Sequence, residues 1–336
     1  MKNFNLIKQS SGITTTTIII LSISLAARFF VFNIPATPSS LAVSAADMPL
    51  GRLLDSMPIP ETTSFAIAIL LALLNATLLD SIIVRHSLCT HRTFLPMALY
   101  FITAYAIAFP SHPISFSVFQ LALILATLHA INAFRRSYQF QNIFLSAFFI
   151  GLMPLIFSRA IVLVLLLPVT LFLYHRTLRE AVSALAGLLT PWLLCSAAWW
   201  IAGCEWLYCF TNLGLQLNTT TNQTILGLLT TQPLSIKIFA GLYAVLGIAS
   251  VIIILRSFTP AKNRVQRIYT HFLWMTVLGM VLMFFAGAEM VGYGTLAVAG
   301  TVIITSFFIR YKGWLPLLAY VSIAALAILS NLPAFA

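Results

Sequence analysis

The sequence predicts an all-α fold, namely a polytopic transmembrane helical bundle. Sixty per cent of its 336 residues are hydrophobic, only 7% are charged, and the mean hydropathy is +1.00. A water-soluble domain of this size does not bury that much apolar surface, whereas a membrane protein turns it toward lipid. The apolar residues also fall into separate runs of helical length. We therefore expect a single integral membrane domain, 1–336, with membrane lipids as its surroundings.

The net charge of +11 has a topological explanation. In a soluble chain such a charge would suggest binding to nucleic acid. Here the basic residues stand between the apolar runs, where they fix the orientation of membrane spans. The sequence therefore predicts no nucleic-acid partner.

Eleven apolar runs are the predicted spans. The first follows Lys2 and Lys8. The alternative, a signal peptide cleaved near 43–45, is weakened by the distance between that site and the apolar run. The runs are 13–32, 62–84, 94–109, 114–133, 142–157, 160–174, 181–202, 234–255, 270–287, 290–309 and 314–330.

The runs 142–157 and 160–174 predict a hairpin with Arg159 at its tip, because only Ser158 and Arg159 separate them. Each limb is about 24 Å long as a helix, which is short against a hydrocarbon core of about 30 Å. A single helix in their place would be about 50 Å long and would contain Pro154, Pro168 and a central arginine.

The basic residues favour the hairpin and set the orientation. With the amino terminus inside, 14 of the 18 Lys and Arg lie on the inner side, the others being Arg28, Arg52, Arg159 and Lys237. Without the hairpin, most of the bases that follow it would face outward, against the positive-inside rule. We therefore expect about eleven spans, an outward carboxyl terminus, and outward loops at 33–60 and 203–233.

Three residues are candidates for binding a charged substrate. Arg159 lies below the outer headgroups, so its guanidinium either grips a phosphate or extends to the headgroups from the tip. Arg52, in the first outward loop, would assist in holding phosphate. Glu289 stands in a short turn between spans, where it binds a proton or cation, pairs with Lys237 or Arg28, or merely solvates the turn.

Three outward acids are candidate catalytic residues. Asp47, Asp55 and Glu61 lie in or at the end of loop 33–60, where a carboxylate can act as general base on a hydroxyl; loops also carry acids by default. No paired Asp-x-Asp or Glu-x-Asp is present to hold a metal, and the chain lacks phosphate-binding and dinucleotide motifs. We therefore predict neither metal nor cofactor.

The cysteines and the polar residues inside spans have structural interpretations. Cys204 and Cys209 are the outward pair that an oxidising compartment could join, whereas Cys195, inside a span, has no evident partner. Asn75 and Asp80, on the second span, are expected to form bonds between helices.

The segment from the hairpin through Arg176, Arg179, Glu180, Gly187 and Pro191 resembles the central part of an uncharacterised family of polytopic bacterial inner-membrane proteins. Members of that family have a short hydrophobic pair, then an Arg-Glu juxtamembrane motif, then a helix with Gly and Pro. The resemblance implies a multi-pass envelope protein of the bacterial inner membrane but no particular activity.

A weaker resemblance, in its many spans and acid-bearing first outward loop, is to GT-C glycosyltransferases and O-antigen polymerases. The chain departs from the former in lacking a diacidic motif and a soluble carboxyl-terminal domain, and from the latter in having few outward arginines. The leading hypothesis is glycosyl transfer or polymerisation on a polyprenyl-phosphate-linked sugar at the outer leaflet. The alternatives are an accessory or scaffold subunit with membrane-protein partners, and a transporter or flippase.

Overall fold

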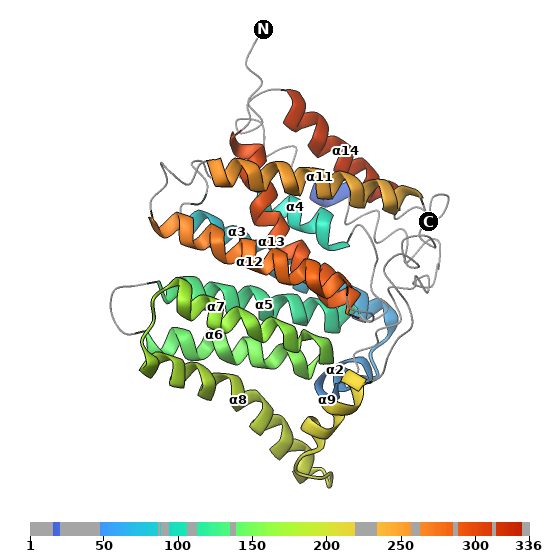
Figure 1. Ribbon diagram of the computed structural model, residues 1–336. Helices are drawn as coiled ribbons and strands as arrows, with labels where there is room; N and C mark the ends of the chain where they lie inside the picture. Colours follow the sequence, from blue (N-terminus) through green and yellow to red (C-terminus); the bar gives the residue numbers. More distant parts are fainter. Residues whose placement is uncertain are drawn as a thin grey trace.

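The computed structural model describes most of the chain, and its regular structure there is helical throughout (Figure 1). The described residues are 16–20, 48–86, 88, 94–105, 113–134, 139–218, 234–256, 263–284, 288–310 and 314–330. The named helices are α2 (Pro49–Asp55), α3 (Glu61–Arg85), α4 (Leu95–Tyr105), α5 (Pro113–Asn132), α6 (Phe140–Leu152), η2 (Met153–Leu155), η3 (Ser158–Leu165), α7 (Leu166–Leu173), α8 (Leu178–Ile201), α9 (Tyr208–Asn218), α11 (Leu234–Arg256), α12 (Asn263–Phe284), α13 (Glu289–Arg310) and α14 (Trp314–Ser330). Asp47 and most of the predicted span 13–32 lie outside the described residues.

Five of the described helices are long and apolar enough to cross a membrane: Thr63–Arg85, Pro113–Asn132, Leu178–Ile201, Lys237–Arg256 and Glu289–Arg310. Each coincides with a predicted span. Shorter apolar helices occupy four further predicted spans, at Leu95–Ala104, Phe140–Leu155, Ser158–Leu173 and Trp314–Ala327. The all-helical fold is therefore confirmed, whereas the count of eleven spans and the orientation of the termini stay predictions.

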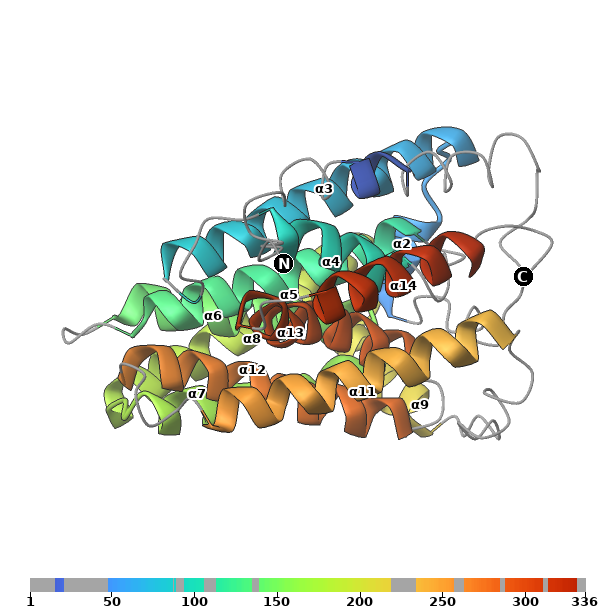
Figure 2. The same ribbon diagram turned by 90° about the horizontal axis from the view of Figure 1, so that it is seen from above.

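The centre of the bundle is α13. From Glu289 to Ile309 every residue except Leu296 is buried, because α4, α5, α11 and α12 all pack against this helix. Helices α5, α6, α11 and α12 run roughly side by side in both views (Figures 1 and 2), and α8 and α14 are inclined to them in Figure 1.

Helix α8 lies at the edge of the bundle and packs mainly on α6. The two backbones approach closely at Gly151 and Gly187: a Cβ at Gly187 would overlap the carbonyl oxygen of Phe144, and one at Gly151 would overlap that of Leu188. Small residues allow this contact, which is typical of membrane helices. Elsewhere on α8, a series of large apolar side chains remains exposed, as expected for a lipid-facing surface.

The segment 140–173 folds back on itself. After α6 and η2, Phe157 is extended, and η3 and α7 then return. Gln139 before α6 and Arg176 after α7 both contact Glu180, so the two limbs begin and end at the same end of the bundle. We call this the clamp end, and the opposite end, which carries Ser158 and Arg159, the tip end.

Candidate functional site

The tip end is where segments far apart in the sequence meet. Met48, at the start of α2, shares a buried cluster with Leu155, Trp192 on α8 and Cys209 on α9. Leu50 and Ile161 pack against the same cluster. Helices α2 and α9 therefore cover the hairpin tip, and both lie at the right-hand end of the bundle in Figure 1.

The hairpin tip is enclosed by protein rather than exposed. All residues from Met153 to Ser158 are buried, and the eight-residue η3 that follows is a 3₁₀-helix. A 3₁₀-helix of this length is uncommon and often marks a functional hinge or strained sequence. Non-helical backbone at membrane depth is tolerated where protein buries it or where it lines a watery cavity. Arg159, half-buried, stands on the first turn of this element.

An aromatic layer connects the tip to the central helix. The ring of Phe157 packs edge-on against Phe119 of α5, with centroids 5.7 Å apart. The rings of Phe119 and Phe116 press in turn against Gly294 of α13, where a Cβ would lie 3.0 Å from each ring. Glycine at 294 therefore allows α5 to pack closely against α13. Through Phe119 and Phe157, the starts of α5 and α13 are also held beside the hairpin tip.

The charged residues predicted from the sequence lie around this layer. Asp55, the last residue of α2, accepts a hydrogen bond from the Ser115 hydroxyl at the start of α5. Arg52, on the same short helix, is exposed. Glu289 is the buried first residue of α13, where the helix dipole favours a carboxylate. Its neighbour Met290 shares a buried cluster with Phe116, the residue after Ser115.

The structure thus brings Arg52, Asp55, Arg159 and Glu289 to the tip end. Glu61 is the first residue of α3, and Asp47 lies outside the described residues. Arginines and carboxylates at one end of an apolar bundle are suited to binding a phosphate and accepting a proton from a hydroxyl. Within the described part of the chain, no group of three or more His, Cys, Asp or Glu that could hold a metal is present.

The clamp end is organised by Glu180, which lies in the first turn of α8. Its Oε1 accepts hydrogen bonds from the Gln139 backbone N–H at 3.0 Å and from Arg176 at 3.2 Å. Its Oε2 accepts from the backbone and hydroxyl of Thr177, at 3.1 and 3.3 Å. Arg176 also donates to the carbonyl of Ala133, just beyond α5. The pair therefore joins the end of α5 to the starts of α6 and α8.

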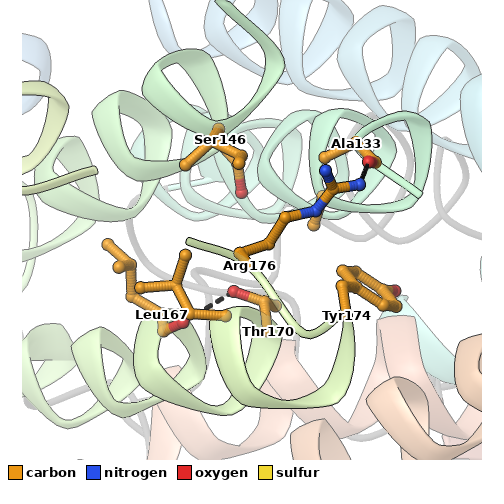
Figure 3. A pocket seen from close by; sticks show the side chains of 9 residues that line it. Ala133, Ser146, Leu167, Thr170, Tyr174 and Arg176 are labelled. Carbon is orange, nitrogen blue, oxygen red and sulfur yellow. Dashed lines mark hydrogen bonds between the residues drawn. The ribbon is translucent and has the colours of Figure 1, made fainter. Parts of the chain in front are cut away.

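Beside this pair is a narrow pocket between α5, α6 and α7 (Figure 3). It encloses about 290 Å³ including its open mouth, and its interior has room for about one water molecule. The hydroxyls of Ser146 and Thr170 in its wall are bonded to helix carbonyls. The pocket is thus small and mostly apolar, and it does not present a site for a large substrate.

Tyr174 closes α7 beside the pocket. Its ring packs against Phe134 at 5.4 Å, and the Arg267 guanidinium lies 5.3 Å from the centre of the Phe134 ring.

A third polar region lies inside the bundle between α3, α4 and α5. The Asn75 amide donates to the carbonyl of Ser117 at 3.0 Å, which confirms the predicted bond between helices. The Tyr100 hydroxyl donates to Gln120 Oε1 at 2.7 Å. Among the described residues, Asn75 Oδ1 and Gln120 Nε2 are buried without a hydrogen-bond partner. The sequence argument missed Gln120, although a glutamine inside an apolar run is the same signal that identified Asn75.

The fold and these sites define a polytopic α-helical protein with helices suited to crossing a membrane. Comparisons with models of protein families, with curated proteins and with solved structures found no match.

Proposed function

We propose that this chain is a multi-pass protein of a bacterial inner membrane that binds a polyprenyl-phosphate-linked sugar at its tip end, facing the outer leaflet, and transfers or polymerises the sugar. The observation that carries the proposal is the enclosure of the hairpin tip by α2 and α9. This arrangement brings the helix that carries Arg52 and Asp55 to the element that carries Arg159. An exposed tip would instead favour an arginine that only reaches the headgroups.

In this proposal the arginines bind and the carboxylate reacts. Arg159 and Arg52 hold the phosphate by charge-assisted hydrogen bonds and stabilise it as the leaving group. Asp55 takes the proton from an acceptor hydroxyl, whose oxygen attacks the anomeric carbon while the bond from that carbon to the phosphate oxygen breaks. The Ser115 hydroxyl orients the Asp55 carboxylate. Asp47 and Glu61 are alternative candidates for the general base, and Glu289 is a candidate for binding the acceptor.

The binding step is tested with the purified chain in nanodiscs and a labelled polyprenyl-phosphate-linked sugar. Arg159→Ala is expected to weaken binding roughly 10- to 100-fold, because a hydrogen bond to a charged group contributes about 1.5–3 kcal/mol. Arg159→Lys keeps the charge but loses the bidentate geometry, so its affinity should lie between those of the unmodified chain and Arg159→Ala. Arg179→Ala, an exposed arginine near the clamp end, is the matched control and should bind like the unmodified chain. Equal binding by the Arg159→Ala chain would refute the proposal.

The chemical step is tested separately. Asp55→Asn should retain the sugar donor but lose its transfer to an acceptor, whereas Ser115→Ala should transfer at a reduced rate. Loss of donor binding in Asp55→Asn would mean that Asp55 acts in binding and not as the base.

A second candidate function is transport of a small polar solute, which the region around Asn75 and Gln120 favours. Two buried polar atoms without partners are costly in an apolar bundle, and bound water or a polar solute would supply the missing hydrogen bonds. The test is uptake into proteoliposomes. Gln120→Leu should abolish uptake if this path exists, whereas Arg159→Ala should leave it unchanged.

A further inference from the structure

Two thiols from different helices meet at the tip end. Cys195 lies on α8 and Cys209 on α9, and their sulfur atoms are 3.3 Å apart. Cys209 is fully buried, and Cys195 packs against the cluster that contains it. Cys204, which the sequence paired with Cys209, lies in the linker between the two helices, and Cys195, Cys204 and Cys209 are all free thiols in this structure. The local spacing did not predict this contact, because α9 folds back along α8 and carries Cys209 to Cys195.

We propose that Cys195 and Cys209 form a disulfide that fixes α9 to α8, and that the tip end accordingly faces an oxidising compartment. The two sulfur atoms are 3.3 Å apart, and a disulfide bond is about 2.05 Å long. The sulfur atoms therefore need to approach each other only slightly for the bond to form. The surroundings strengthen the case, since Trp192, Trp199 and Leu213 hold both helices around the pair. This inference does not depend on the proposed sugar transfer, because it rests on the packing of α9 alone.

The reaction is a thiol–disulfide exchange, and the oxidant is a disulfide of a dithiol oxidoreductase or of a small thiol. One cysteine thiolate attacks that disulfide and forms a mixed disulfide, releasing one thiol. The second cysteine then attacks the mixed disulfide, closing the Cys195–Cys209 bond and releasing the other thiol. Two protein thiols are oxidised and one disulfide is reduced to two thiols. Because Cys209 is buried once α9 docks, we expect the exchange to precede docking.

The experiment is a thiol count on the unmodified chain. Membranes are quenched with acid, denatured and alkylated before and after reduction, and linked peptides are identified by mass spectrometry without reduction. Of the four cysteines, two should be alkylated before reduction and all four after it, with a linked peptide pair containing Cys195 and Cys209. Four free thiols before reduction, or a bond between Cys204 and Cys209, would overturn the inference.

Single cysteine-to-serine variants test which two cysteines form the disulfide. Cys204→Ser is the control and should leave the linked peptide unchanged. Cys195→Ser and Cys209→Ser should each abolish it and leave three thiols open to alkylation. If either of these variants retained a bond that closes within the chain, the assigned pairing would be wrong. The count on the unmodified chain decides the question even if a variant fails to accumulate.

Discussion

Arg176 and Glu180 form an ion pair of 3.2 Å whose two side chains are only 9% and 2% exposed. The pair spans one turn at the start of α8 and also contacts the backbone beyond α5 and before α6. The segment of Arg176, Arg179 and Glu180 noticed in the sequence therefore forms a junction between three helices, through Arg176 and Glu180. Its role is architectural, and the proposed substrate site lies at the other end of the bundle.

Removing one member of this pair should destabilise the protein strongly. Glu180→Ala leaves the Arg176 guanidinium buried without its counter-ion, which in buried pairs costs about 3–5 kcal/mol. Thermal unfolding in detergent should show a clear fall in the midpoint. Arg179→Ala removes an exposed neighbouring charge and serves as the control, with little change expected. A midpoint for Glu180→Ala equal to that of the control would contradict the assigned role.

Gly187→Ala should separate α8 from α6. A methyl group at this position would overlap the Phe144 carbonyl oxygen, and overpacking of this kind costs about 1–3 kcal/mol. The expected result is a lower unfolding temperature together with faster proteolysis of α8. Gly247→Ala on α11 is the matched control, since nothing lies within 4 Å of its added Cβ. The prediction fails if both substitutions behave alike.

Tyr243 and Gly300 should be energetically coupled. The Tyr243 hydroxyl donates to the Leu296 carbonyl at 3.1 Å and occupies the space that a Cβ on Gly300 would need. Gly300→Ala should therefore destabilise by about 1–3 kcal/mol. Adding Tyr243→Phe should recover part of that loss, because it removes the atom that clashes most. A double variant whose destabilisation equals the sum of the single ones would show that the residues do not interact.

The two ends of the bundle should lie on opposite sides of the membrane. Arg52 and Arg179 are both exposed and mark the tip end and the clamp end. Arg52→Cys and Arg179→Cys are each made in a chain in which Cys89 and Cys204, the two cysteines outside the Cys195–Cys209 pair, are replaced by serine. An impermeant maleimide added to intact cells should label position 52 alone, and position 179 only after permeabilisation. Labelling of both from one side would contradict the topology predicted from the basic residues.

Hydropathy and charge predicted much of the fold. The five long apolar helices coincide with predicted spans, and the hairpin at 142–174 was chosen because it keeps the later basic residues on one side. Hydropathy is a property of each local run of residues, and the basic loops alternate regularly between the two sides along the chain. Both signals can therefore be read from one sequence. Helix α12 begins at Asn263 rather than near 270, because a helix continues into polar sequence beyond the apolar run.

Contacts between distant segments were not predictable in the same way. The sequence placed Asp55 and Arg159 on one side of the membrane, but nothing in it indicated that α2 would cover the hairpin tip or that Ser115 would bond Asp55. The long 3₁₀-helix at the tip was likewise missed, since the run 160–174 is typical of an ordinary span. These features depend on which helix faces pack together, and hydropathy does not report that choice.

The enclosure of α13 has a consequence for how the protein is made. Its neighbours α4, α5, α11 and α12 all precede it in the chain, and among the described helices only α14 follows it. Until α13 leaves the ribosome and enters the bilayer, those four helices lack their common partner, and the polar side chain of Thr103, which meets Thr301 in the finished bundle, lacks its contact. The bundle therefore cannot be completed before α13 has been made. A chain that stops before Glu289 should be held by the insertion machinery and degraded by membrane proteases.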